Sequence, residues 1–192
     1  MTLPIVISCM HKTNSSVQVD NQLTKWLEGE LRSDHAGETG AVWIYRGILA
    51  TSTDPRVREF AQRHLETEKQ HLKLIEATLR RNQRSWLLPL WRVAGFLTGT
   101  LPSVFSSNAV FATVSTVENF VVSHYMAQIG RLQSHNSHNN ICGVLKSCCD
   151  DEVKHESEAS NLLNGRPSFL LRVWCALVSS SSNLAVKCAR VI

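Results

Sequence analysis

The sequence has little proline or glycine and no strand-like patterning, which argues against a β-rich fold. Among 192 residues there are 5 prolines and 9 glycines, and no stretch alternates apolar and polar residues as a half-buried strand does. Long helices are therefore the expected elements. A chain of this length is large enough for one domain with a sizeable core.

The six cysteines lack the spacing of a zinc site. No pair forms Cys-x-x-Cys, and Cys148 and Cys149 are adjacent, an arrangement that rarely gives a structural disulfide. We expect reduced thiols that pack between helices in a reducing compartment. The first residues also lack a basic leader followed by a long apolar run, so a secretory signal is not expected.

Two apolar stretches are too diluted by polar residues to predict a membrane span. Residues 93–117 carry no charge but include Pro102, while Arg172 and the serines 179–182 interrupt residues 169–186. A spanning helix needs about 20 predominantly apolar residues, so both stretches are expected to be interfacial or buried helices. The net charge of +4 fits weak attraction to anionic lipid and is too small to predict nucleic-acid binding.

Four segments carry a helical stripe, with apolar residues at three- and four-residue steps. These stripes run over residues 27–48, 61–79, 111–132 and 141–162. Asp54 followed by Pro55 predicts the start of the second helix, because Asp caps helices and Pro suits the first turn. Residues 1–20 show no periodicity and are expected to be a flexible tail, with 21–192 as a single helical domain. The predicted fold is all-α, a four-helix bundle with two additional short apolar helices.

Each stripe contains a carboxylate where an apolar residue is expected. The four residues are Glu38, Glu68, Glu118 and Glu152. Burying four carboxylates together is very unfavourable, so a positive charge must neutralise them. Glu68 and Glu152 each begin a Glu-x-x-His pair, with His71 and His155 one turn later on the same helix face. A glutamate oxygen and an imidazole nitrogen can then bind one ion together.

The order of these residues indicates a duplicated helical hairpin. Glu68 follows Glu38 by 30 residues, and Glu152 follows Glu118 by 34. A glutamate from each of two helices and Glu-x-x-His from each of the other two is the di-iron or di-manganese pattern of ferritin-like bundles. A lone Glu-x-x-His is usually a solvated surface pair, whereas two pairs in register with buried glutamates predict a two-metal site.

Two further residues are candidates for a supporting role. Asp34 and His64 lie one turn before Glu38 and Glu68, and each could orient a ligand. For both residues the alternative is a position without contact to the metal site, such as the helix surface.

Residues 34–41, Asp-His-Ala-Gly-Glu-Thr-Gly-Ala, resemble the first signature of the demethoxyubiquinone hydroxylase family. The segments 68–72, 117–125 and 152–155 are similar to its later motifs, and the resemblance covers residues 21–165. It implies six iron ligands, which are Glu38, Glu68, His71, Glu118, Glu152 and His155. It also suggests that His124 and Tyr125 line the quinone site, with ordinary packing as the alternative. Asn119 and Ser123 depart from the acidic and histidine residues of the family.

The resemblance implies a di-iron monooxygenase of ubiquinone biosynthesis that hydroxylates the ring of a demethoxyubiquinone-type polyprenyl quinol. Two iron ions and molecular oxygen would be required, with NADH or a protein electron donor as the reductant. The chain has no Gly-rich nucleotide fingerprint. Other proteins of the same pathway are expected partners, a homodimer is left open, and nucleic acid is not expected.

A basic and aromatic segment suggests peripheral association with a membrane. Arg80, Arg81, Arg84 and Arg92 flank Trp86 and Trp91. Arginines beside tryptophans suit the headgroup region of a bilayer, and the alternative is a buried connector between the halves of the bundle. We expect the protein to face the cytoplasm or an equivalent reducing compartment.

Three other functions are consistent with parts of the pattern. A ferritin- or rubrerythrin-like oxidase or peroxidase would share the metal site without a lipid-facing segment. A di-iron hydroxylase could act on another substrate, such as a tRNA base. A helical membrane adaptor without enzymatic activity would leave its carboxylates in water.

Overall fold

The computed structural model describes residues 8–136 and 138–192, with side-chain surroundings from Leu23 onward, and these residues are helical without strands. The helices are α1 (Ser8–Thr51), α2 (Pro55–Thr78), α3 (Leu88–Phe105), α4 (Ser107–Ser134), α5 (Asn139–Asn161) and α6 (Phe169–Ala189). A 3₁₀ turn, η1 (Arg81–Gln83), lies in the connection between α2 and α3. The all-α prediction is confirmed.

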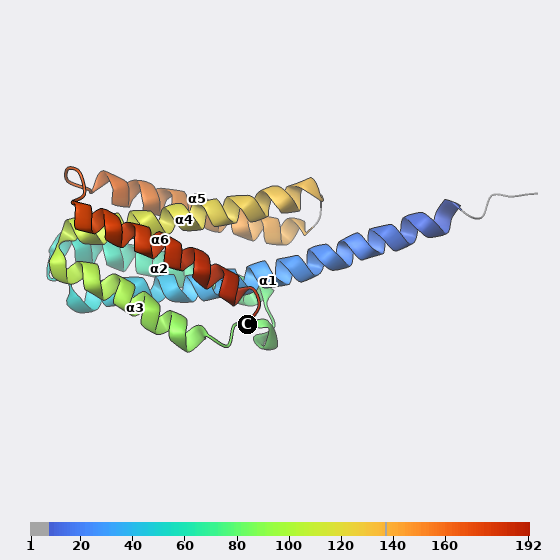
Figure 1. Ribbon diagram of the computed structural model, residues 1–192, viewed down its shortest axis with the longest axis horizontal. Coiled ribbons are helices and arrows are strands. Elements are labelled where there is room, and N and C mark those ends of the chain that lie inside the picture. The colour runs from blue at the N-terminus through green and yellow to red at the C-terminus, as the bar shows by residue number, and fades with distance from the viewer. Residues whose placement is uncertain (1–7, 137) are drawn as a thin grey trace, which may run out of the picture.

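Four helices form the bundle, and the other two cover one side of it (Figure 1). Helix α1 packs against α2, and α4 packs against α5, which is the pairing expected of two helical hairpins. Helix α3 lies mainly against α1, and α6 lies against α4 and α1. The two additional apolar helices have 18 and 21 residues.

The core consists of two apolar layers with a polar layer between them. One layer includes Tyr45, Phe60 and Phe111, and the other includes Ile75 and Leu145. Along each of the four bundle helices, residues of one layer come before the predicted ligand positions and residues of the other layer come after them. The bundle therefore holds the glutamates at one level in the middle of the molecule.

Side-chain caps fix the starts of two helices, and the first of them is the start predicted at Asp54 and Pro55. The carboxylate of Asp54 accepts a hydrogen bond from the Arg56 amide at 2.9 Å, at the start of α2. The hydroxyl of Ser168 accepts one from the Leu171 amide at 3.3 Å, at the start of α6. Gly165, between α5 and α6, has a φ of 71°, a conformation that glycine adopts without steric penalty.

The described part of the N-terminal segment is helical. Residues 8–20 are the first part of α1, a helix that the apolar periodicity of the sequence does not predict. This part of α1 extends away from the bundle (Figure 1). Apolar periodicity reports packing against a neighbour, and a helix that extends beyond its neighbours needs none. Residues 1–7 lie outside the described residues, and the division into a tail and one domain stays a prediction.

Helix α3 approaches α1 closely through glycines. A Cβ atom at Gly95 would overlap the carbonyl oxygen of Gly40, and one at Gly99 would overlap that of Ile44. Small residues allow two helix backbones to come this close. Because Gly40 lies in the same helical segment as Glu38, α3 is held directly beside the polar layer.

Both covering helices leave apolar side chains exposed. On and beside α3 these are Trp86, Leu90, Val93, Leu97, Leu101, Val104 and Phe105, and on α6 they are Phe169, Leu170, Val173, Leu177 and Leu184. In the described part of the chain, α6 alone is long and apolar enough to cross a membrane by length and composition. Exposed apolar surface of this extent is typical of an interaction surface.

Candidate metal centre

The structure brings all six predicted ligands together in the polar layer. The single glutamates come from α1 and α4, and the two Glu-x-x-His pairs come from α2 and α5. All six side chains are buried, and they are Glu38, Glu68, His71, Glu118, Glu152 and His155. The helical hairpins thus place residues that are far apart in the sequence around one point.

These residues form two overlapping groups that could each hold a metal ion. One group is Glu38, Glu68, His71 and Glu152, and the other is Glu68, Glu118, Glu152 and His155. Within each group, one potential ligand atom from every residue lies within 4.8 Å of the others. Glu68 and Glu152 belong to both groups, so each can offer one oxygen to either position.

Both histidines direct Nδ1 toward the glutamates. The Nδ1 of His71 lies 2.9 Å from Glu152 Oε1, and the Nδ1 of His155 lies 3.0 Å from Glu152 Oε2 and 3.1 Å from Glu68 Oε1. Both oxygens of Glu68 and Oε2 of Glu38 are buried without hydrogen-bond geometry to any described residue. Oxygens buried in this way need a cation, and carboxylate and imidazole donors suit iron or manganese. The residues therefore fit a two-metal centre.

The electrostatics of the cluster also call for positive charge. Burial raises the pKa values of Glu38 and Glu118 well above the usual range, and the neighbouring carboxylates Glu68 and Glu152 raise them further. Burial acts in the same direction on Glu152, but hydrogen bonds with His155 and His71 outweigh it and lower the pKa to about 2. In the metal-free protein, protonated histidines thus supply part of the charge that a metal would provide.

Two tyrosines support the glutamates that belong to only one group. The hydroxyl of Tyr45 donates to Glu118 Oε1 at 2.7 Å, and the hydroxyl of Tyr125 donates to Glu38 Oε1. Asp151 Oδ2 lies 3.3 Å from His71 Nε2 and holds that ring from its far side. Sequence reasoning missed Tyr45 and Asp151 as supports. For Asp151 the available signal was its place directly before Glu152.

The other two candidate supports have different surroundings. Asp34 accepts a hydrogen bond from Gln128 Nε2 at 2.7 Å and lies 3.1 Å from His124 Nε2, so its partners are outside the glutamate cluster. His64 is buried, and its ring packs against that of His155 with 4.1 Å between centroids. Burial lowers the pKa of His64 to about 4, and the nearby His155 acts in the same direction.

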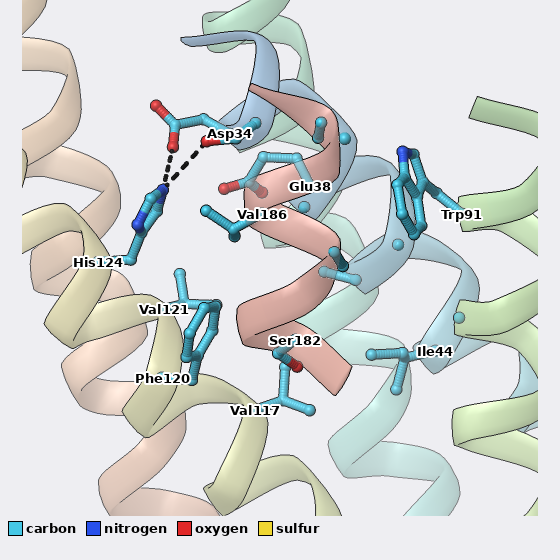
Figure 2. A pocket seen from close by; sticks show the side chains of 18 of the residues that line it. Asp34, Glu38, Ile44, Trp91, Val117, Phe120, Val121, His124, Ser182 and Val186 are labelled. Carbon is cyan, nitrogen blue, oxygen red and sulfur yellow. Dashed lines mark hydrogen bonds and ion pairs between the residues drawn. The ribbon is translucent and has the colours of Figure 1, made fainter. Parts of the chain in front are cut away.

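A largely apolar cavity of about 210 Å³ adjoins the cluster. It lies between α1, α3, α4 and α6, and the four cluster glutamates contribute to its wall. Figure 2 shows Trp91 on one side, Phe120 and Val121 on the other, and Glu38 between them. The cavity could hold an apolar ring next to the metal-binding atoms, away from bulk water.

His124 and Tyr125 both line this cavity, as the sequence suggests. His124 is held by Asp34 and by the Ser33 hydroxyl, which lies 3.3 Å from Nε2 (Figure 2). Asn119 and Ser123 are exposed on α4 and line a separate polar pocket together with His124. The departures from the family pattern therefore lie outside the inner cavity.

The bundle, the two overlapping glutamate and histidine groups and the adjoining cavity define a ferritin-like protein with a carboxylate-rich metal-binding core. Sequence comparison narrows this class. The family model described as "Ubiquinone biosynthesis protein COQ7" matches residues 25–189, and the chain belongs to this family. The resemblance carried by residues 34–41 is thereby confirmed.

Named relatives agree with this assignment. The "NADPH-dependent 3-demethoxyubiquinone 3-hydroxylase, mitochondrial" of Mus musculus is 30% identical over 155 residues, which are 79% of this chain and 70% of that protein. The protein of the same name from Rattus norvegicus is 31% identical with the same coverage. The "3-demethoxyubiquinol 3-hydroxylase" of Rhodospirillum rubrum is 37% identical over 105 residues, 53% of this chain and 50% of that protein.

Proposed function

We propose that this chain is a di-iron monooxygenase that hydroxylates the ring of a demethoxyubiquinone-type polyprenyl quinol. The observation that carries the proposal is the pair of overlapping ligand groups beside an apolar cavity. The names of the mouse and bacterial relatives supply the substrate class. A storage or adaptor protein would have no use for a ring-sized apolar space beside its metal ligands.

In this proposal Glu38 and His71 would hold one iron and Glu118 and His155 would hold the other. Glu68 and Glu152, which belong to both groups, would contribute to both positions. Two reduced irons bound there would supply the activation of molecular oxygen that hydroxylation of an electron-rich ring needs. Hydrogen bonds from Tyr45, Tyr125 and Asp151 hold three of the six ligands in fixed positions, which are Glu118, Glu38 and His71. All four glutamates line the cavity, so metal ions held by them would lie beside it.

The cavity binds and orients the substrate ring. Its apolar walls exclude water and favour the quinol over polar competitors. His124 offers a polar group at the wall, and Asp34 fixes the orientation of the imidazole. Tyr125 lines the same cavity, but its hydroxyl donates a hydrogen bond to Glu38. Its proposed role is therefore to hold Glu38 in position and to shape the cavity wall.

The exposed apolar faces of α3 and α6 are the proposed route to lipid. A polyprenyl quinol resides in the bilayer, and both helices contribute walls of the cavity. Peripheral association through these faces would let the ring enter while the tail stays in lipid. The mouse and rat relatives are NADPH-dependent by name, so NADPH takes the place of NADH as the expected reductant, with a protein donor as the alternative.

Product analysis in cells tests the proposal. The full chain is expressed in a strain that accumulates the demethoxy precursor, and ubiquinone is measured by mass spectrometry. We expect restored ubiquinone with the native chain and with Glu66→Gln, which changes an exposed residue of α2. Glu118→Gln should abolish the product, because it removes a proposed iron ligand.

Metal analysis of the purified protein completes this test. We expect about two irons per chain, as in ferritin-like di-iron bundles. Bound iron without product would contradict the hydroxylase assignment and favour an oxidase or peroxidase. Absence of bound iron would contradict the metal centre itself.

A further inference from the structure

The two proposed metal positions have equivalent supports at their single glutamates. Tyr125 on α4 donates to Glu38 on α1, and Tyr45 on α1 donates to Glu118 on α4. Each hairpin thus contributes the tyrosine that holds the glutamate of the other hairpin. This exchange follows the duplication seen in the spacing of the ligands.

The supports of the two histidines are different. Asp151, the residue before Glu152, contacts Nε2 of His71 at 3.3 Å. The corresponding residue before Glu68 is Thr67, which has no carboxylate. Among the residues that the structure describes, no carboxylate oxygen lies within 4.0 Å of His155 Nε2. His155 therefore lacks the anchor that His71 has.

His64 occupies the place beside His155. The two rings meet edge to face, with centroids 4.1 Å apart and planes at 70°. His64 is 3% exposed, and its Nε2 lies 3.0 Å from Glu158 Oε2, to which it donates. Arg63 holds the same carboxylate with two hydrogen bonds of 2.6 and 3.2 Å.

The His64 ring also contacts Tyr45, the residue that supports Glu118. His64 stacks on Tyr45 with 5.7 Å between ring centroids and an angle of 15°. Tyr45 in turn holds Glu118. The His64 side chain, which is held by Glu158, thus packs against both His155 and the support of Glu118. His155 and Glu118 are the two ligands that occur only in the second group.

We propose that His64, fixed by Glu158, is a positioning residue that orients His155 at the metal position it shares with Glu118. This inference rests on the proposed di-iron centre. The hydrogen bond to Glu158 prevents the His64 ring from rotating. Because the fixed His64 ring packs against His155, it sets the direction in which His155 Nδ1 points. The two metal positions then depend on different supports, Asp151 for one and His64 for the other.

Anaerobic loading of the full chain with ⁵⁷Fe(II) tests this proposal. Mössbauer spectra and stepwise titration report each iron separately, without reliance on turnover. We expect His64→Leu and Glu158→Leu to weaken one of the two binding steps by about 10- to 100-fold, the usual effect of losing an outer support. The other step and its spectrum should stay unchanged. Glu158→Gln, which keeps an oxygen acceptor for His64, should retain most of the affinity.

Two further variants complete the design. Asp151→Leu should weaken the opposite step, and Glu66→Gln, an exposed change on the helix of His64, should weaken neither. Glu158 is partly exposed, so its variants are expected to fold even if His64→Leu does not, and circular dichroism checks this.

Three outcomes would overturn the inference while leaving the di-iron centre in place. These are unchanged binding steps in folded Glu158→Leu, equal weakening of both steps, or equal loss in Glu158→Gln and Glu158→Leu. A native chain that binds no iron would instead overturn the proposed function.

Discussion

At the residue scale, Glu118 illustrates how the site opposes the stability of the fold. Its carboxylate is buried, and burial together with Glu152 and Glu68 holds its pKa well above the usual range. Such an acid binds more protons in the folded state than in the unfolded state. The free energy of unfolding therefore falls as pH rises above the ordinary glutamate pKa.

Glu118→Gln should consequently stabilise the metal-free protein. Glutamine keeps an oxygen acceptor for Tyr45 and removes the buried charge. We expect a gain of about 1–2 kcal/mol at pH 7, larger at pH 8 than at pH 5, since the charge is absent at low pH. Urea unfolding of the apoprotein measures this gain, and a destabilised variant would contradict it. The same substitution should remove the stabilisation that added iron gives the native chain.

Metal uptake should depend on pH through the histidines. Burial lowers the pKa of His155, but the hydrogen bond with Glu152 and the ion pair with Glu68 outweigh it and raise the pKa to about 11. The pKa of His71 is raised as well. His155 therefore holds a proton at neutral pH in the apoprotein, and His71 keeps its proton to higher pH than an ordinary histidine; a metal must displace these protons. Affinity should therefore rise with pH, by about tenfold per pH unit for each proton displaced.

Calorimetry checks this dependence. Fe(II) or Co(II) binding is measured anaerobically between pH 6 and 8, in two buffers with different ionisation enthalpies. Proton release appears as a difference in apparent binding enthalpy between the buffers. Affinity that is constant with pH, with no proton released, would show that the histidines are neutral before the metal binds.

At the scale of the helices, the contact of α3 with α1 controls the shape of the cavity. A Cβ at Gly99 would overlap the Ile44 carbonyl oxygen, so Gly99→Ala must move α3 outward. We expect a loss of about 1–3 kcal/mol, as for overpacked cores, and weaker binding of a quinone analogue. Gly130→Ala is the matched control, because an added Cβ there meets no atom within 4 Å. In a helix interior that change should stabilise by about 0.5–1 kcal/mol.

The sequence predicts where the bundle helices lie along the chain, but it does not predict how they are rotated against one another. Apolar periodicity identified the four bundle helices, and carboxylates on the buried stripe indicated where the polar layer lies. Periodicity does not specify how each helix rotates against its neighbour. The support of Glu118 by Tyr45, of His71 by Asp151 and of His155 by His64 depends on those rotations. Helical backbone at residues 8–20 was missed because the prediction relied on packing periodicity.

At the scale of the whole molecule, the proposed metal ligands and the exposed apolar surface belong to different helices. The four bundle helices carry the proposed ligands, whereas α3 and α6 carry exposed apolar side chains and contribute walls of the cavity. Under the proposed function, a ring that enters from lipid between these two helices would reach the glutamates without crossing the bundle. The fold would then keep the proposed metal-binding layer away from solvent and still admit an apolar substrate.

Membrane association should therefore depend on the outer face of α6. Leu177 and Leu184 are 61% and 63% exposed, and transfer of each to lipid contributes about 1.5–3 kcal/mol. The double change to Glu should lower partition onto phosphatidylcholine–phosphatidylglycerol vesicles by more than about tenfold in a flotation assay. Leu74→Glu, an exposed change on α2, is the control and should leave partition unchanged. If the double variant floats with the vesicles as well as the native chain does, substrate must reach the cavity without α6 resting on the bilayer.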